Sequence, residues 1–137
     1  MRRLKRLAGL TTGERGLLLR AFFVVGVSRV SLWALPFAIA RRVVIATAGE
    51  AEGIPMEGLV WAVKVASRYL PRATCLTQAL AAQALLARAG HKSCIEIGVA
   101  KDAEHRFEAH AWVICGDQVV IGGPDIGRYT LVTAWES

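Results

Sequence analysis

The stretch PRATCLTQALAAQALLARAG, residues 71–90, has the pattern of an amphipathic helix with a cysteine in its first turn. Pro71 interrupts the chain before it, and the hydroxyl of Thr74 can accept a hydrogen bond from a first-turn backbone N–H, as an N-cap residue does. Apolar residues then recur at the spacing i, i+4, i+8, which places them on one helical face. Gly90 stands where a C-terminal cap is expected. The sequence therefore predicts that Cys75 lies at the N-terminal end of a helix.

Cys75 would thus lie at the positive end of the helix macrodipole, which favours the thiolate over the thiol. Most cysteines are small buried apolar residues, and that is the alternative interpretation of Cys75. His110 favours a catalytic role for Cys75 over a role as a small buried residue. It lies in an apolar, strand-like run, residues 107–123, FEAHAWVICGDQVVIGG. By itself His110 is more typical of a hydrogen-bonded core histidine. Together, however, a thiol at a helix N-terminus and a histidine on a sheet are what a cysteine nucleophile requires: the thiolate attacks, and the imidazole later protonates the leaving amine.

A third group should orient the imidazole. Gly116 and Asp117 have the composition of a two-residue hairpin turn. With that turn, strand pairing places His110 opposite Gly123, and Asp125 then falls diagonally adjacent on the same face. Asp117 itself lies at the tip of the turn, too far along the strand. Asp125 is therefore the candidate for the acid, with Asp117 or no acid at all as the alternatives.

Helix-like segments precede strand-like segments along the chain. The expected elements are, in order, two helices within residues 12–48 with Pro36 near the start of the second, a loop over 49–57, an amphipathic helix over 58–70, the cysteine helix, a strand at 93–100 and a hairpin over 109–123. This order indicates the α+β class, with a helical N-terminal part followed by the cysteine helix packed on a small antiparallel sheet.

The composition is that of one globular domain: 137 residues, 54% hydrophobic and 20% charged. The three cysteines are odd in number and lack the spacing of zinc ligands, so we expect no disulfide framework, a reducing cytoplasm, and no metal or cofactor. Cys94 and Cys115 fall in apolar runs and are expected in the core. His91 and His105 are expected in loops, without acids or cysteines at ligand spacing.

The basic residues are concentrated in the first part of the chain. Residues 1–48 hold nine Lys/Arg and a single acid, Glu14, whereas the rest holds eight Lys/Arg and ten Asp/Glu. Such a start is typical of a contact with RNA, a membrane surface or an acidic peptide, or of a solvated helix face. The longest uncharged run within the apolar stretch, residues 30–40, has eleven residues, against the roughly 20 that span a bilayer. We therefore expect no transmembrane span, while peripheral membrane contact stays open.

The segments PRATCLTQALAAQALLARAGHK, IEIGVA and FEAHAWV together resemble the transglutaminase-like leader peptidases of lasso-peptide biosynthesis. The likeness extends over about residues 61–123, and its core is C-L-x-x-A-L followed by A-H-A-W-V. It implies a papain-like fold and a Cys-His-Asp protease that removes the leader from a ribosomally made precursor peptide. Cys75 matches the family's nucleophile and His110 its histidine. The family's acid follows on the next strand, where this chain has Gly122-Gly123, so Asp125 takes that role by strand geometry alone.

The resemblance also implies partners: the precursor peptide, a small leader-recognition protein, and an ATP-dependent cyclase that closes the ring. We expect residues 1–57 to form a helical, basic docking region and residues 58–137 the catalytic core, within one compact domain. Trp33, Leu35 and Phe37 could pack on a partner, although such a stripe is more often ordinary core. No nucleic-acid partner is expected.

Two other functions stay open. An acyl or amide transferase would use the same Cys75–His110 pair with an amine in place of water, and both reactions share the acyl-enzyme. A non-catalytic peptide-binding protein would bury Cys75 and act through its basic N-terminus. Fast reaction of Cys75 with a thiol alkylator would indicate the peptidase or the transferase, whereas slow reaction would indicate the binding protein.

Overall fold

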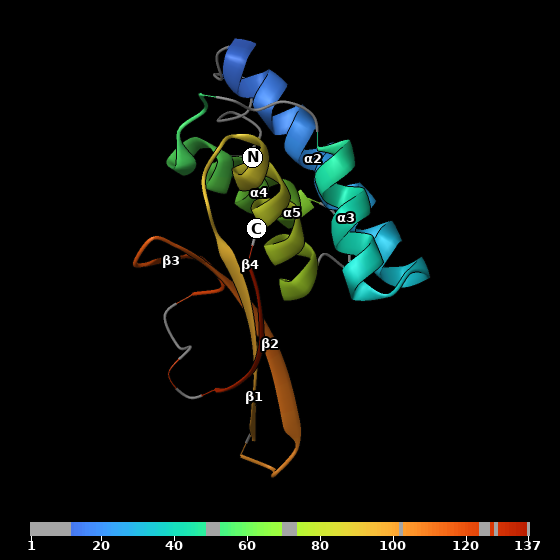
Figure 1. Cartoon of the computed structure of the whole chain (residues 1–137), viewed down its shortest axis with the longest axis vertical. Coiled ribbons are helices and arrows are strands. Elements are labelled where there is room, and N and C mark those ends of the chain that lie inside the picture. Colours follow the sequence, from blue (N-terminus) through green and yellow to red (C-terminus); the bar gives the residue numbers. More distant parts are fainter. Residues whose placement is uncertain are drawn as a thin grey trace.

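The computed structural model describes residues 12–48, 53–69, 74–101, 103–123, 127 and 129–136, without the side chains of residues 12–14. Within these residues the elements are α2 (Thr12–Ala34), α3 (Phe37–Thr47), α4 (Met56–Tyr69), α5 (Cys75–Arg88), β1 (Cys94–Lys101), β2 (Phe107–Cys115), β3 (Gln118–Ile121) and β4 (Thr130–Glu136). The helices gather together, and the antiparallel sheet lies beside them, with β1 and β2 extending beyond the helical part (Figure 1). Helices followed by an antiparallel sheet confirm the predicted α+β class.

Helix α5 begins and ends where the sequence predicted. The Thr74 side chain accepts a hydrogen bond from the backbone N–H of Thr77, 3.2 Å away, so Thr74 is the N-cap. At the other end Gly90 has a φ of +88°, the left-handed conformation that glycine adopts without strain. The N–H of His91 then donates to the carbonyl of Leu86 at 2.8 Å, the reversal that closes many helices. These local signals explain why the helix could be recognised from the sequence.

The middle of α5 is buried on all sides rather than on one face as expected. Helices α2, α3 and α4 pack around it, and β2 lies against it. Gln83 is fully buried in this run and therefore needs hydrogen-bond partners. Its amide nitrogen donates to the carbonyl of Trp135 at 2.7 Å, and its oxygen accepts from Nε of Arg41 at 2.8 Å. These bonds join α5 to β4 and to α3.

The sheet has the strand order β3-β2-β1-β4, and each neighbouring pair is antiparallel. The predicted hairpin turn is confirmed, because Cys115 pairs with Gln118 across Gly116, whose φ is +63°. Further from the turn the register shifts by one residue, so that Val113 pairs with Ile121. The prediction that His110 lies opposite Gly123 assumed one continuous register from the turn. That register is wrong beyond Ile114, because a bulge adds one residue to β3.

Strand β4 was not predicted from the sequence. It pairs with β1, with Trp135 opposite Ile95, and its register shifts next to Gly98. Its segment TLVTAWE is rich in β-branched and aromatic residues, which is a strand signal. The strand lies at an edge of the sheet and most of its side chains are exposed, so it lacks a clear alternation of apolar and polar residues.

The two faces of the sheet have different neighbours. Ile95, Ala111 and Val113 are buried in the same core as the helices, so their face of the sheet packs on the helical layer. Successive residues of a strand point to opposite faces. His110 and Trp112 therefore lie on the other face, away from the helical layer.

Helices α2 and α3 share the core of the rest of the protein. Val24 of α2 and Val44 of α3 are fully buried with the residues of α4 and α5. The ring of Phe37 packs edge-on against Trp135, with centroids 5.0 Å apart. Trp33, in contrast, is 80% exposed. Of the stripe predicted to meet a partner, Phe37 therefore contributes to the interior, and Trp33 faces outward.

One helix in the described part of the chain is long and apolar enough to cross a membrane by length and composition. It is the segment Arg15–Ala34 of α2, with a mean hydropathy of 1.6 and 33% of its apolar window buried inside the protein. Core helices of soluble proteins and signal sequences near an N-terminus have the same properties. The segment is therefore weak support for a membrane span.

Candidate active site

Cys75 is the first residue of α5 and directly follows the N-cap Thr74. Its side chain is half-buried. The first turn of the helix holds no acidic residue, so no carboxylate of that turn opposes a negative charge on the sulfur. The backbone N–H groups of a first helical turn carry partial positive charge, which stabilises an anion at this end. Cys75 thus lies in the first turn of a capped helix, as the sequence predicted.

His110 lies on β2, half-buried, and its ring is held by the backbone of the segment after β3. Its Nε2 atom is 2.7 Å from the carbonyl oxygen of Gly122. A carbonyl oxygen can only accept a hydrogen bond, so Nε2 must carry the hydrogen. In the neutral ring this leaves the lone pair on Nδ1, the atom that can take up a proton. The carbonyl of Gly122 therefore orients the imidazole, as the carboxylate of a triad would.

Aromatic side chains surround the His110 ring. The ring centroid of Tyr129 is 5.2 Å away and that of Trp112 is 6.0 Å away. The indole N–H of Trp112 donates to a carboxylate oxygen of Glu96 at 3.2 Å, which holds the indole in place. A Cβ atom on Gly98 would lie 2.7 Å from Trp112 and 2.9 Å from Tyr129, so only glycine leaves room for both rings. The two rings thus restrict how far the imidazole can turn.

Replacing Gly122 with alanine should destabilise the protein strongly. Gly122 has a φ of +106°, and an added Cβ would overlap Cβ of Trp112 and lie 2.8 Å from its Cα. We expect the unfolding free energy in urea to fall by roughly 3–5 kcal/mol, from backbone strain and overpacking together. Gly123 is the matched control, because it also has a positive φ of +76° but nothing within 4 Å of its Cβ position. Gly123→Ala should cost only about 1–2 kcal/mol, and equal losses in the two variants would contradict the close packing of Gly122 on Trp112.

The structure brings His110 to the carbonyl of Gly122, but among the described residues it shows no contact between His110 and Cys75. Helix α5 packs on β2, yet the helical layer is contacted by Ala111 and Val113 rather than by His110. Within the described part of the chain, no hydrogen bond joins the thiol of Cys75 to the imidazole. The pairing of Cys75 with His110 therefore stays a prediction, to be tested by substitution.

The two candidate acids have different positions. Asp125 lies outside the described residues, so its placement beside His110 stays a prediction. Asp117 is exposed in the hairpin turn, as expected. The orienting group that the structure does show, the carbonyl of Gly122, was not predicted from the sequence. The only signal for it was the Gly122-Gly123 pair at the place where the resembled family has its acid.

The other two cysteines are less buried than predicted. Both Cys94 and Cys115 lie in strands but are half-buried rather than part of the core. Burial raises the pKa of the Cys94 thiol, and the carboxylates of Glu96 and Glu136 raise that pKa further. Cys94 is therefore held as the neutral thiol, which reacts slowly with alkylators. The Cys115 thiol donates to the carbonyl of Lys92 at 3.4 Å.

The remaining histidines lie in loops, as predicted. A ring nitrogen of His91 is 2.9 Å from the carbonyl of Ile54, so this histidine ties the end of α5 to the start of α4. His105 is exposed in the turn between β1 and β2 and has a positive φ of +64°. Among the residues that the structure describes, no three His, Cys, Asp or Glu side chains are grouped so that they could hold a metal ion.

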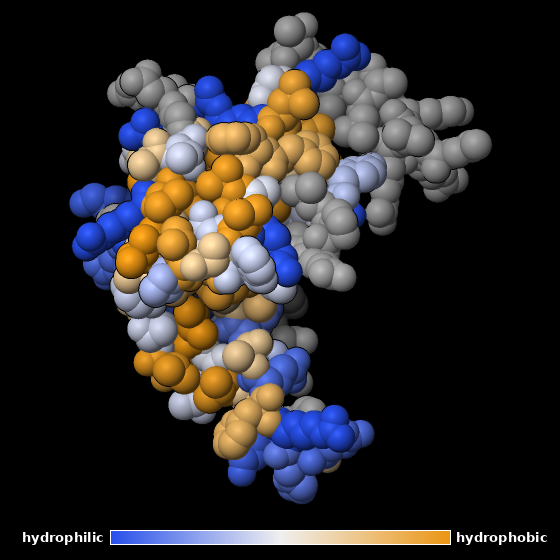
Figure 2. Space-filling view, turned by 90° about the vertical axis from the view of Figure 1, so that its right-hand side faces the viewer, coloured by the Kyte–Doolittle hydropathy of each residue, from blue (hydrophilic) through white to orange (hydrophobic). Residues whose placement is uncertain are grey.

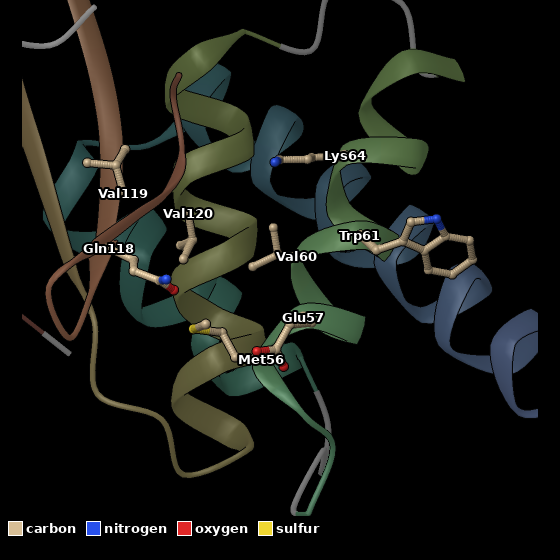
Figure 3. Close-up of a pocket in the computed structure, with 8 residues that line it drawn as sticks. All are labelled: Met56, Glu57, Val60, Trp61, Lys64, Gln118, Val119 and Val120. Atoms are coloured by element: carbon tan, nitrogen blue, oxygen red, sulfur yellow. The ribbon is translucent and has the colours of Figure 1, made fainter. Parts of the chain in front are cut away.

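A hollow of about 650 Å³ lies between α4 and β3 (Figure 3). Met56 and Val60 of α4 and Val120 and Gln118 of β3 extend toward one another across it. Strand β3 is an edge strand of the sheet, and such an edge can pair with an added extended chain. The described residues that line the hollow do not include Cys75. The hollow is therefore not built around the candidate nucleophile.

Helix α5, which begins with Cys75, packs on a four-stranded antiparallel sheet whose strand β2 carries His110. The family model of the Transglutaminase-like superfamily matches residues 17–134, and the chain belongs to this superfamily. The matched range begins inside α2, so it extends over both N-terminal helices as well as the sheet. Comparisons with curated proteins and with solved structures gave no match.

Proposed function

We propose that the protein is a cysteine peptidase that removes the leader from a ribosomally made lasso-peptide precursor. The observation that carries this proposal is the position of Cys75, at the capped start of α5 in a chain of the Transglutaminase-like superfamily. The paired motifs around Cys75 and His110, which resemble those of lasso leader peptidases, supply the choice of substrate. The proposed reaction also requires Nδ1 of His110, the ring nitrogen that does not meet the carbonyl of Gly122, to accept the proton of Cys75, although the structure has His110 on the sheet face opposite the helical layer.

In the proposed reaction the Cys75 thiol gives its proton to Nδ1 of His110, and the thiolate attacks the carbonyl carbon of the last leader residue. A carbon–sulfur bond forms, and the negative charge on the carbonyl oxygen is favoured by the positive end of α5. The carbon–nitrogen bond then breaks, and His110 passes its proton to the amine of the released core peptide. Water, deprotonated by His110, hydrolyses the thioester and releases the leader as a carboxylate.

The proposed orienting group is the backbone carbonyl of Gly122 rather than a side-chain acid. A carbonyl holds the ring and its tautomer as a carboxylate does, but it supplies only a partial negative charge. Asp125→Asn should therefore lower kcat/KM by less than about tenfold. A loss of about a hundredfold or more would instead assign the third position to Asp125, as the sequence predicted. Asp117→Asn is the matched control and should leave the rate unchanged.

The decisive experiment is incubation of the protein with a leader–core precursor, with and without the leader-recognition protein, followed by mass spectrometry of both products. Hydrolysis yields the leader with a free carboxylate. A transferase would yield a leader extended by the mass of an added amine. If neither product forms under any of these conditions, the peptidase proposal is wrong.

A non-catalytic peptide-binding protein is distinguished by the reactivity of its cysteines. A nucleophilic Cys75 should be alkylated near neutral pH well before Cys94, whose thiol is held neutral by burial and by neighbouring carboxylates. Peptide mapping of the modified protein identifies which cysteine reacted first. Cys75 reacting no faster than Cys94 would favour the binding protein.

We propose that the peptidase acts in the cytoplasm with a small leader-recognition protein and with the ATP-dependent cyclase. The resemblance of the motifs to those of lasso leader peptidases supports both partners. Stimulation of cleavage by the recognition protein in the precursor assay tests the first partner. Co-purification of the cyclase with the peptidase tests the second.

A further inference from the structure

Helix α2 carries a row of large apolar side chains that face outward. Leu19 is 71% exposed, Phe23 58%, Val30 64% and Trp33 80%. At about 100° per residue these four positions fall within roughly 80° of one another around the helix, so they form one stripe. We call these four residues the α2 stripe. Figure 2 shows the side of the molecule on which α2 lies, and apolar side chains gather there.

The opposite side of α2 is the side that contributes to the protein core. Ala21, Val24, Val25 and Ser28 are fully buried there, about half a turn around the helix from the α2 stripe. The helix thus has two apolar sides, and only the buried side contributes to the protein core. An exposed apolar surface of this kind on a folded protein indicates a binding surface.

Basic residues border the α2 stripe. On the same helical geometry, Arg20 and Arg29 lie about 80–100° from Leu19, one on each side of the stripe. Arg15 precedes Leu19 by one turn. This is the arrangement of a helix that lies in a membrane interface, where the apolar side enters the acyl boundary and the arginines reach anionic headgroups.

The length of the α2 stripe, its end residue and the hollow beside it also support contact with lipid. The stripe runs along the helix for about 21 Å at the rise of an α-helix, with an exposed tryptophan, a residue that favours membrane interfaces, at its end. Beside it, Gly26 lies in a shallow apolar hollow of about 440 Å³ whose other lining residues include Phe23 and Val30. Such a hollow has room for part of an acyl chain, and its only polar side chain is that of Ser31.

We propose that the protein binds peripherally to anionic lipid membranes through the α2 stripe, with α2 lying parallel to the surface. Because Val24 and Val25 on the other side of α2 are core residues, the helix cannot enter the bilayer completely without opening the core. This proposal is independent of the proposed peptidase activity.

The test is sedimentation of the full-length protein with lipid vesicles. We expect binding to vesicles of equimolar phosphatidylglycerol and phosphatidylcholine, and much weaker binding to phosphatidylcholine alone, because the arginines contribute only with anionic lipid. Leu19→Gln/Phe23→Gln should lower the partition coefficient at least about tenfold, since two apolar side chains no longer leave water. The matched control is Leu131→Gln/Val132→Gln on β4, where the two residues are 52% and 62% exposed, and it should bind like the parent.

Circular dichroism checks that the stripe variant folds, and Trp33→Gln near the end of α2 provides a second variant with a smaller effect on the helix. Equal vesicle binding by the parent, the double variant and Trp33→Gln would overturn the proposal. So would a dimer in light scattering that the stripe variant abolishes while vesicle binding is absent, because a second copy would then cover the α2 stripe. Membrane association that resists high salt and alkaline carbonate would indicate a spanning helix and would also overturn it.

Discussion

Cys75→Ala is expected to abolish cleavage of a leader–core precursor, with kcat/KM falling by about four orders of magnitude or more. Without the sulfur no thioester can form, and the remaining groups have no nucleophile to activate. The fold should be retained, because the substitution removes a single half-buried atom and leaves the N-cap bond of Thr74 in place. The measurement is the rate of leader release under single-turnover conditions, with thermal unfolding as the check on folding.

Cys115→Ala is the matched control for the loss of Cys75. Cys115 is also half-buried, but it lies at the turn end of β2 and its thiol donates to the carbonyl of Lys92. This variant should cleave at the parent rate and lose roughly 1 kcal/mol of stability at most. Continued cleavage by Cys75→Ala, with the control unchanged, would falsify the cysteine-peptidase proposal.

The parts of the fold that could be predicted from the sequence are those specified by neighbouring residues. Thr74 and Gly90 determine the ends of α5 through bonds that reach no further than a few positions along the chain. The turn at Gly116 is likewise specified by residues close to it in the sequence. Helix α4 was expected over 58–70 and lies at Met56–Tyr69 for the same reason, since its apolar residues recur at helical spacing.

The parts that could not be predicted depend on distant segments. The bulge that pairs Val113 with Ile121 depends on how β3 packs, and no residue of the turn indicates it. Strand β4 forms because β1 offers it a free edge. Burial on all sides of α5 also depends on the helices around it, because the pattern of α5 itself predicted only one apolar face.

The candidate site also has a part that could be predicted from the sequence and a part that could not. Cys75 and His110 could be singled out because each is a reactive side chain in a recognisable local setting. The carbonyl of Gly122 could not, since every residue has a backbone carbonyl and only the folded chain shows which one meets the imidazole. The α2 stripe was only partly recognised, because Trp33 was considered together with Phe37, which turned out to pack on Trp135.

His110→Ala is expected to be as inactive as Cys75→Ala, with cleavage again reduced by about four orders of magnitude. The thiol would lose the group that accepts its proton, and the leaving amine would lose the group that protonates it. Members of one catalytic unit are not additive, so the double variant Cys75→Ala/His110→Ala should be little worse than either single variant.

A structural role for His110 predicts a different pattern, and His110→Gln separates the two. A glutamine amide can still donate a hydrogen bond to the carbonyl of Gly122, which His110 meets at 2.7 Å, but it offers no basic nitrogen. We therefore expect His110→Gln to be about 1 kcal/mol more stable than His110→Ala and equally inactive. If His110→Gln instead cleaves the precursor at a rate close to that of the parent, His110 is a hydrogen-bonded core residue between Trp112 and Tyr129, and the base must be sought elsewhere.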